Sequence, residues 1–353
     1  MRVVVIGGTN FIGPYVVATL HRLGHEITVY HRGQHEPELP RGVRHIHSPL
    51  AGIPVLHFPS EISDPAPDVV LHMFPVGADD ARTAMARFAG VARRMVALSS
   101  GDVYRAYGRL LGTEPGPAEP VPLDENAPLR EALYPYRHMA AGPADWTFHY
   151  EKILAERALM SDPSLPATVL RLPAVYGPGD PYRRLRPYNK PMEDRRPAIL
   201  LDSPQAEWRW THGYVENVAQ AIALAVVDDR GAGKIYNVGE AETPTVADRV
   251  RSIGRLAGWN GEVVPLASDK LPPHLRSPHE SHQDLVVDTS RLRDELGFTE
   301  VHSMDEGLRR TIEWEHANSP TTGDPGFAEY AAEDAMLSLR DSARFRWPPH
   351  PIY

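Results

Sequence analysis

The chain has 353 residues, 42% of them hydrophobic and 24% charged, which is the usual balance of a globular enzyme. Its formal net charge of -9 disfavours nucleic acid and anionic membranes as partners. The absence of cysteine excludes disulfides, thiolate metal sites and cysteine nucleophiles. No apolar run approaches the roughly 18 residues of a membrane span. MRVVVIGG enters a strand with no export signal before it, so we expect a cytoplasmic protein.

Two periodicities alternate along the first half of the chain. Short β-branched runs are typical of buried parallel strands, and the amphipathic stretches between them are typical of helices. The predicted strands are Val3–Ile6, Ile27–Tyr30, Val69–His72, Met95–Leu98 and Thr168–Leu172, and the predicted helices are Phe11–Leu23 and Asp79–Val91. This alternation predicts an α/β fold, a Rossmann-like doubly wound parallel sheet.

The second half of the chain predicts a smaller C-terminal substrate-binding lobe. A helix over Glu216–Val227 and a strand over Lys234–Val238 should return to the large sheet, whereas helices over Val246–Ala257 and Met304–Glu315 should build the lobe. We therefore divide the chain into a dinucleotide-binding domain at 1–177, completed by about 213–241, a substrate-binding lobe at 178–212 and 242–318, and a C-terminal extension at 319–353 with one more helix over Phe327–Leu339.

A glycine-rich loop, GGTNFIG at 7–13, follows the first strand and opens the first helix, as a dinucleotide-binding fold requires. Gly7 permits the tight turn, and Gly13 permits close packing of helix on strand. The free N–H groups of the helix N-terminus suit a pyrophosphate. Asn10 holds the middle position of the glycine pattern and tolerates left-handed backbone angles. The predicted cofactor-binding residues of this loop are Gly7, Thr9, Asn10, Phe11, Ile12 and Gly13.

The end of the second predicted strand indicates which dinucleotide binds. NAD-selective folds place an acidic residue there to bind the ribose 2′-hydroxyl. This chain reads TVYHRG, with His31 and Arg32. A guanidinium holds a 2′-phosphate through paired hydrogen bonds. We therefore assign His31 and Arg32 to the cofactor site and favour NADP(H), with NAD(H) as the alternative.

Several further motifs occur in order along the chain. They are LSSGDVY at 98–104, Lys152 in a K-x-x-A-E pattern, RLPAVYGPGD at 171–180, YVENVAQAIALAV at 214–226, IYNVGE at 235–240 and VDTSRLRDELGF at 287–298. Together they resemble the extended short-chain dehydrogenase/reductase family, also called the NAD-dependent epimerase/dehydratase family, over about residues 1–315. The resemblance implies that Ser100 hydrogen-bonds a substrate oxygen. It also implies that Lys152 binds the nicotinamide ribose and lowers the pKa of a catalytic tyrosine.

The same resemblance implies a second lobe that holds the substrate, very often a nucleotide-linked sugar, and a homodimer formed through helices near 79–92 and 147–162. Four positions depart from the family pattern. Phe148 replaces the tyrosine four residues before the lysine, Asn10 replaces a glycine, and Pro49 stands where an aspartate usually lies near the adenine. Trp210 falls where nucleotide-sugar enzymes often carry an arginine, and Arg209 is one position off, which weakens a nucleotide-sugar assignment.

Phe148 leaves the usual proton donor missing. On one helix, positions 148 and 152 would share a face. Tyr150 lies about 200° around a regular helix from Lys152 and reaches the site only if the helix begins late or bends. His149 is closer in direction and titrates in a useful range. Other candidates in nearby segments are Asp102, Tyr104, Tyr134, Tyr136 and His138. We assign Ser100, Lys152 and Tyr150 as the catalytic residues, with Tyr150 as the proton donor, and leave the others open.

These patterns predict an NAD(P)-dependent oxidoreductase or epimerase that acts on a hydroxyl or carbonyl of a small polar, sugar-like molecule, with non-standard proton transfer. One alternative is a reaction in which the substrate or water moves the proton. Another is a non-catalytic NADP(H)-binding regulator or scaffold. We predict no metal site, because His274 and the H-x-x-H pair His279 and His282 have no nearby carboxylate pattern to complete one.

Overall fold

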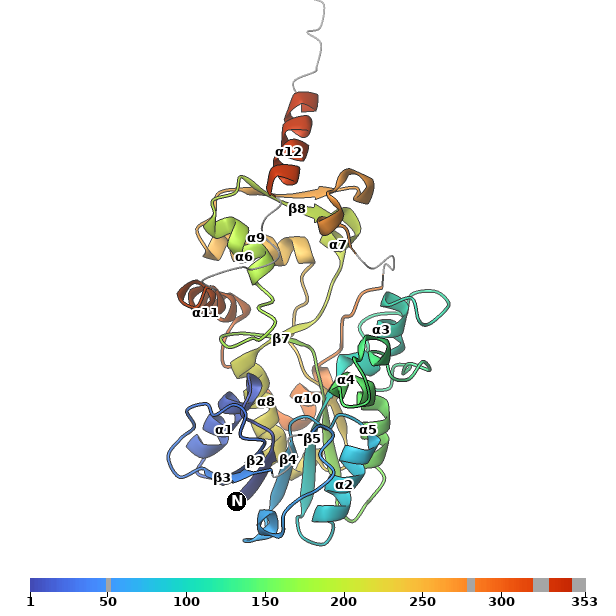
Figure 1. The fold of residues 1–353 in the computed structure, drawn as a ribbon, viewed down its shortest axis with the longest axis vertical. Helices are drawn as coiled ribbons and strands as arrows, with labels where there is room; N and C mark the ends of the chain where they lie inside the picture. Colours follow the sequence, from blue (N-terminus) through green and yellow to red (C-terminus); the bar gives the residue numbers. More distant parts are fainter. Residues whose placement is uncertain (49–51, 278–282, 320–329, 345–353) are drawn as a thin grey trace, which may run out of the picture.

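The computed structural model describes residues 1–48, 52–277, 283–319 and 330–344. Figure 1 shows a large α/β unit and a smaller α/β lobe, with α12 (Tyr330–Arg344) at the far end of the lobe. Two short paired strands, β7 (Ala174–Tyr176) and β9 (His212–Tyr214), lie where the chain passes between the unit and the lobe.

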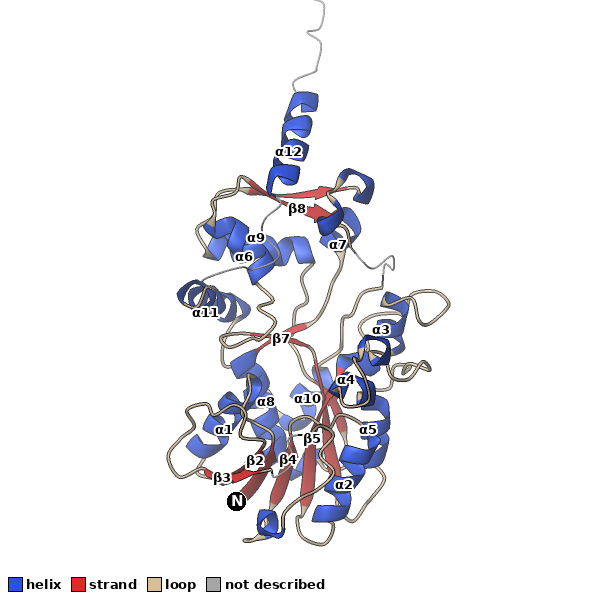
Figure 2. Ribbon diagram, viewed as in Figure 1, coloured by secondary structure: helices blue, strands red, loops and turns tan. Residues whose placement is uncertain are grey.

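The large unit is built on one parallel sheet in the order β10-β6-β5-β4-β1-β2-β3 (Figure 2). Its strands are β1 (Arg2–Ile6), β2 (Glu26–His31), β3 (Arg44–His47), β4 (Val69–His72), β5 (Arg94–Ser100), β6 (Ala167–Leu172) and β10 (Ile235–Asn237). The order of the strands reverses direction between β1 and β4. Ligands of open α/β sheets bind outside the carboxyl ends of the strands at such a reversal.

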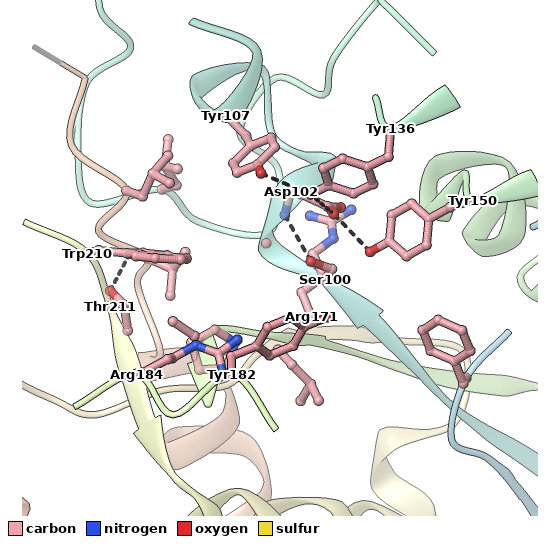
Figure 3. A pocket seen from close by; sticks show the side chains of 18 of the residues that line it. Ser100, Asp102, Tyr107, Tyr136, Tyr150, Arg171, Tyr182, Arg184, Trp210 and Thr211 are labelled. Carbon is pink, nitrogen blue, oxygen red and sulfur yellow. Dashed lines mark hydrogen bonds between the residues drawn. The ribbon is translucent and has the colours of Figure 1, made fainter. Parts of the chain in front are cut away.

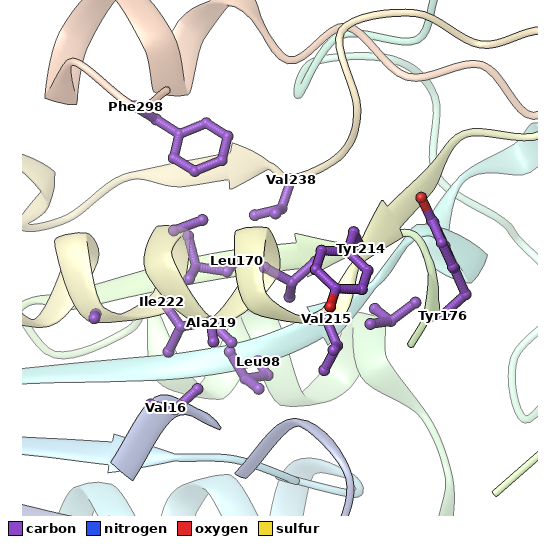
Figure 4. Packing of buried hydrophobic residues seen from close by; sticks show 14 of the residues in the cluster. Val16, Leu98, Leu170, Tyr176, Tyr214, Val215, Ala219, Ile222, Val238 and Phe298 are labelled. Carbon is purple, nitrogen blue, oxygen red and sulfur yellow. The ribbon is translucent and has the colours of Figure 1, made fainter. Parts of the chain in front are cut away.

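Helices cover both faces of this sheet (Figure 2). The first face carries α1 (Ile12–Arg22) and α8 (Val215–Val227), and the second carries α2 (Ala78–Phe88) and α5 (Lys152–Leu159). α8 is apolar on nearly every side, as expected of a helix enclosed by protein. Figure 4 shows Val16 of α1 and Ile222 of α8 packed over Leu98 and Leu170 of the sheet. This core holds the carboxyl edge of the sheet in place beneath the pocket described below.

The smaller lobe is built around two parallel strands, β8 and β11. Its elements are α6 (Arg186–Glu193), β8 (Ala198–Asp202), α7 (Ser203–Glu207), α9 (Val246–Leu256), β11 (Glu262–Leu266) and α11 (Met304–Ala317). Two further short helices, α3 (Arg105–Leu110) and α4 (Trp146–His149), lie over the edge of the large unit beside the lobe. No helix in the described ranges has both the length and the apolarity needed to cross a membrane.

The predicted fold class is confirmed, and so are the predicted strands and helices of the large unit, with ends that move by one to three residues. The predicted tail helix corresponds to α12, and its first predicted residues, 327–329, lie outside the described residues. The domain boundaries stay a prediction. One element departs from them, because α10 (Ser290–Leu296) contacts β10 of the large sheet although its residues were assigned to the lobe.

Candidate active site

The segment that carries Phe148, Tyr150 and Lys152 is not one helix. α4 ends at His149 and α5 begins at Lys152, and the two residues between them are extended, with ψ angles of 111° at Tyr150 and 92° at Glu151. Glu151 is the N-cap of α5, where its side chain accepts the N–H of Ile153 at 2.9 Å. The expectation that positions 148 and 152 share a helical face is therefore wrong.

Phe148 and His149 both lie away from the pocket wall. The guanidinium of Arg137 stacks 4.7 Å from the centre of the Phe148 ring, and its Nε donates a hydrogen bond to the Phe148 carbonyl. The His149 ring is 2.7 Å from the carbonyl oxygen of Pro143. Neither side chain is placed to exchange a proton with a molecule in the pocket.

Tyr150 instead turns into the pocket, which is the condition under which the sequence allowed it to act. The break between α4 and α5 takes Tyr150 off the regular helical path on which it would face away from Lys152. Only 6% of Tyr150 is exposed, and its hydroxyl donates to Oδ2 of Asp102 at 2.8 Å. Tyr136 donates to the same oxygen at 3.0 Å, and its hydroxyl lies 2.9 Å from that of Tyr107 (Figure 3). A buried carboxylate thus accepts two phenols, and a third phenol is linked to it through Tyr136.

Ser100 is the last residue of β5 and faces the same pocket. Its Oγ accepts the backbone N–H of Asp102 at 3.2 Å, which fixes the turn that leaves the strand. It also hydrogen-bonds the Tyr150 hydroxyl, an interaction that by itself lowers the pKa of that phenol. The structure therefore brings Ser100 and Tyr150 together, two hydroxyls at one wall of the pocket (Figure 3).

Electrostatics keep Tyr150 in its protonated form. Burial, followed by the negative charge of Asp102 and the hydrogen bond to it, raises the pKa of Tyr150 well above its ordinary value. Burial also raises the pKa of Asp102. A carboxylate accepts hydrogen bonds from neutral phenols, so this arrangement stabilises the phenol over the phenolate. In this state Tyr150 is suited to give a proton rather than to take one.

Lys152 is the first residue of α5, and its side chain is buried. Its Nζ donates to the carbonyls of Pro75 at 2.8 Å and Leu98 at 3.2 Å, and it lies 5.5 Å from the centre of the Tyr150 ring. Burial lowers the pKa of Lys152 to about 8. Because an ammonium group has three N–H donors, one remains for a ligand after the two carbonyls are served.

The loop at 7–13 is shaped to hold a dinucleotide. Gly7 has a φ of 88°, which is costly for other residues. A Cβ on Gly13 would lie 2.3–2.4 Å from the backbone of Gly8, so only glycine lets α1 approach the loop this closely. Asn10 does not use a positive φ, whereas the next residue, Phe11, has a φ of 40° and a ψ of -95°. Strain of this kind at a non-glycine residue is characteristic of ligand loops.

The remaining predicted cofactor residues lie around this loop and at the end of β2. Thr9 and Ile12 are partly buried within the loop. Arg32 is exposed, whereas the His31 side chain is 2% exposed and its Nε2 lies 2.9 Å from Nδ1 of His45. Direct contact of these residues with a cofactor stays a prediction. Pro49, expected near the adenine, lies outside the described residues.

The pocket itself is a cavity of about 450 Å³ between the carboxyl edge of the sheet and the lobe. Besides Ser100, Asp102 and Tyr150, its wall is formed mainly by aromatic and apolar side chains. They include Phe74, Tyr107, Leu123, Tyr136, Met139, Trp146, Tyr182, Trp210, Leu285 and Val287. Arg184, bound to Asp180 at 2.7 Å, and Arg171 add cationic groups to the wall.

The sequence indicated Asp102 and Tyr136 only as alternatives, and it did not single out Tyr107 or Trp146. The one signal available for Asp102 was its place within LSSGDVY, two residues after Ser100. The tyrosines come from separate loops, and no spacing along the chain connects them.

The sequence model of the NAD dependent epimerase/dehydratase family matches residues 3–239. This is more than half of the chain, so the protein belongs to that family and is an enzyme of it. Its fold and its glycine loop agree with the use of a nicotinamide dinucleotide, for which the family is named.

Individual relatives differ widely in what their names describe. A 3-diazoavenalumate denitrifying reductase from Streptomyces sp is 30% identical over 323 residues, covering 88% of this chain and 100% of that protein. A 2′-dehydrokanamycin reductase from Streptomyces kanamyceticus is 26% identical over 250 residues, covering 67% of this chain and 61% of that protein. The solved UDP-glucose 4-epimerase of Thermotoga maritima has a TM-score of 0.66 at 19% identity, covering 90% of this chain and 99% of that one, which shows a shared fold.

The close approach at Gly13 gives a direct test of the loop. In Gly13→Ala, the new methyl group meets the Gly8 backbone and must push α1 away from the loop, so we expect loss of cofactor binding and a lower melting temperature. Fluorescence titration with NADPH and thermal unfolding measure the two effects. Gly142→Ala is the matched control, since nothing lies within 4 Å of its added Cβ. Unchanged NADPH affinity in Gly13→Ala would show that this loop does not hold the cofactor.

Proposed function

We propose that the protein is an NADP(H)-dependent oxidoreductase that reduces a carbonyl of a small ring-bearing substrate, or oxidises the corresponding hydroxyl, with Tyr150 as the proton donor. The observation that carries this proposal is the placement of Tyr150. Its protonated hydroxyl meets Ser100 at the pocket wall, and the ammonium group of Lys152 lies behind its ring. This geometry supports a catalytic set of serine, tyrosine and lysine in which Tyr150 takes the role that Phe148 cannot fill.

Different residues would bind the cofactor and transfer the proton. The loop at 7–13 would hold the pyrophosphate, Arg32 the 2′-phosphate, and the third N–H of Lys152 the nicotinamide ribose. The cofactor, when bound, supplies or accepts the hydride. When the substrate binds, the Tyr150 hydroxyl would turn its one proton from Asp102 to the substrate oxygen. Ser100 and Tyr150 then donate hydrogen bonds to that oxygen and so polarise the carbonyl. As negative charge grows on that oxygen, Tyr150 passes its proton to it.

Lys152 and Asp102 support this transfer from two sides. The ammonium group of Lys152, 5.5 Å from the ring centre, stabilises the phenolate that remains on Tyr150. Asp102 is hydrogen-bonded to Tyr150 and Tyr136, and Tyr136 lies beside Tyr107. This chain of hydroxyl and carboxyl groups provides a path by which a proton returns to Tyr150 after each turnover.

The pocket favours a ring-shaped substrate. Aromatic side chains such as Trp146, Tyr136 and Trp210 offer flat faces to a sugar or an aromatic ring, and a cavity of about 450 Å³ is in the range of small-molecule sites. Two relatives are named as reductases, of 3-diazoavenalumate and of 2′-dehydrokanamycin. Their substrates differ from each other, so the names support the direction of the reaction and not the identity of the substrate. Trp210 in the wall argues against a diphosphate at that position.

Two single substitutions, one at position 150 and one at position 148, distinguish which of these positions provides the proton donor. We expect Tyr150→Phe to lower kcat by about 10²–10⁴-fold, the usual contribution of general acid catalysis, with little change in NADPH affinity. Phe148→Tyr should leave kcat nearly unchanged, because its ring stacks on Arg137 outside the pocket. Oxidation of NADPH with a panel of cyclic ketones and aldehydes measures both.

The opposite result would redirect the assignment. If Phe148→Tyr creates or greatly raises turnover while Tyr150→Phe has no effect, position 148 is the donor site and the present chain is a weakened enzyme. If a protein that binds NADPH tightly reduces no compound of the panel, the proposed carbonyl reduction is contradicted, and the alternative of a non-catalytic NADP(H)-binding regulator is favoured.

The pH dependence should report the charge of Lys152. Its pKa is lowered to about 8, so the ammonium group is present below pH 8 and is lost as the pH rises through that value. We expect kcat/KM for reduction to fall along a limb with an apparent pKa of about 8. In Lys152→Arg the charge persists, since guanidinium stays protonated, and the remaining activity should lose this limb. A limb that stays near pH 8 in Lys152→Arg would belong to another group.

The choice of dinucleotide should depend on Arg32. A hydrogen bond to a charged group contributes about 1.5–3 kcal/mol, so Arg32→Ala should weaken NADPH binding by about 10–100-fold and leave NADH binding unchanged. Arg41→Ala, an exposed arginine farther along the same loop, is the control. Fluorescence titration measures the affinities, and a wild-type protein that prefers NADH would contradict the assignment.

A further inference from the structure

Three histidines and one glutamate converge at the carboxyl ends of β2 and β3, away from the substrate pocket. The strands run parallel with His31 opposite His47, so these two side chains stand on the same face of the sheet. His45 lies two residues before His47 and therefore shares that face. Glu36 comes from the loop after β2 and turns back over the three rings.

The nitrogen and oxygen atoms of this cluster surround one point. Nε2 of His31 is 2.9 Å from Nδ1 of His45, and Nε2 of His47 is 2.8 Å from Oε1 of Glu36. The cross distances from Glu36 are 3.8 Å to His31 and 3.7 Å to His45. One ligand atom from each of the four residues lies within 4.8 Å of every other. Around a tetrahedral zinc ion with bonds of 2.0–2.1 Å, such atoms lie about 3.3–3.4 Å apart, close to the spacings found here.

The charges and the burial of the cluster also suit a cation. Burial lowers the pKa of His31, which keeps its imidazole neutral with a lone pair to share. A hydrogen bond with His47 lowers the pKa of the Glu36 carboxyl, which keeps it ionised. His31 is 2% exposed at the base of the cluster, whereas His47 is 58% exposed at its mouth, so an ion has an inner ligand and an open path of entry.

We propose that His31, Glu36, His45 and His47 bind one divalent first-row metal ion, with zinc as the preferred ion. Neutral imidazoles and one carboxylate are ligands that zinc accepts, and their mixture excludes the all-oxygen sites of magnesium and calcium. Binding breaks the hydrogen bonds between His31 and His45 and between His47 and Glu36, and each neutral imidazole then carries its one proton on the ring nitrogen that faces away from the ion. For His31 that nitrogen is Nδ1, at the cost of the 3.3 Å contact from the Gly33 N–H.

The ion would be structural in effect. It would cross-link the loop that follows β2 to the two strands β2 and β3. The ion would also lie next to Arg32, at the end of β2, where the 2′ position of the adenosine is expected. It does not touch Tyr150 or the pocket wall. The metal site is therefore separate from the substrate pocket, and its test needs no substrate.

The experiment uses the full chain without a histidine tag, stripped with a chelator and dialysed. Calorimetric titration with Zn²⁺ should show one ion per chain, and Co²⁺ should give the intense visible absorption of a four-coordinate site. Loss of second-shell partners alone weakens metal sites by 10–100-fold, so the double variant His45→Ala with His47→Ala should lose at least about 100-fold in affinity. Its cobalt absorption should disappear.

Two controls keep the result specific. His35→Ala removes an exposed histidine of the same loop and should bind metal like the wild type. The pair His279→Ala with His282→Ala tests the other histidine motif of the chain and should also bind normally. Circular dichroism establishes that each variant is folded. The proposal is overturned if the wild type binds no ion, if the His45 and His47 variant binds as well as the wild type, or if only the His279 and His282 variant loses the ion.

Discussion

The buried carboxylate of Glu151 determines the form of the catalytic wall. It is fully enclosed, and an unpaired carboxylate in such a place would be very costly. Its oxygens are satisfied by the N–H groups of Ile153 and Tyr134, with Arg130 at 3.5 Å. The bond to Ile153 makes Glu151 an N-cap, so the helix begins after it and cannot continue from α4. The place of Tyr150 at the wall follows from that interruption, because a continuous helix would turn Tyr150 away from Lys152.

The interruption is supported by the loop between β4 and α2. Because Glu151 precedes α5, its backbone N–H has no carbonyl acceptor within the helix. It donates instead to the carbonyl of Val76 at 2.8 Å. Gly77 lies directly against the end of α4, where a Cβ would come within 2.6 Å of the His149 carbonyl oxygen. The loop after β4 thus packs against the break and satisfies it. The adjacent Pro75 supplies a carbonyl to Lys152, so the same loop holds the break and the lysine together.

One turn after Lys152, Glu156 fastens α5 to the sheet. Its carboxylate binds the guanidinium of Arg171 on β6 at 2.8 Å and accepts the hydroxyl of Ser99 on β5. Because Arg171 is also bound by Tyr104 and a backbone carbonyl, both buried charges are paired and hydrogen-bonded, which offsets the cost of burying them. Ser99 stands next to Ser100, so the anchor of the helix and the hydroxyl at the pocket wall depend on the same strand end.

The sequence by itself determined the features that depend on local periodicity and on short spacings. The apolar runs predicted the strands of the large sheet, the glycines at 7 and 13 predicted a loop that only glycine fits, and the motif around Ser100 placed it at a strand end. Tertiary structure alone decided the rest. The short strands β7 and β9 pair residues almost forty positions apart. Tyr150 takes the place expected of position 148 because Tyr134 and Val76, far along the chain, hold Glu151 at the break before α5. The histidine cluster exists because β2 and β3 align His31 with His47. Such contacts join groups far apart along the chain, and no local pattern of residues encodes them.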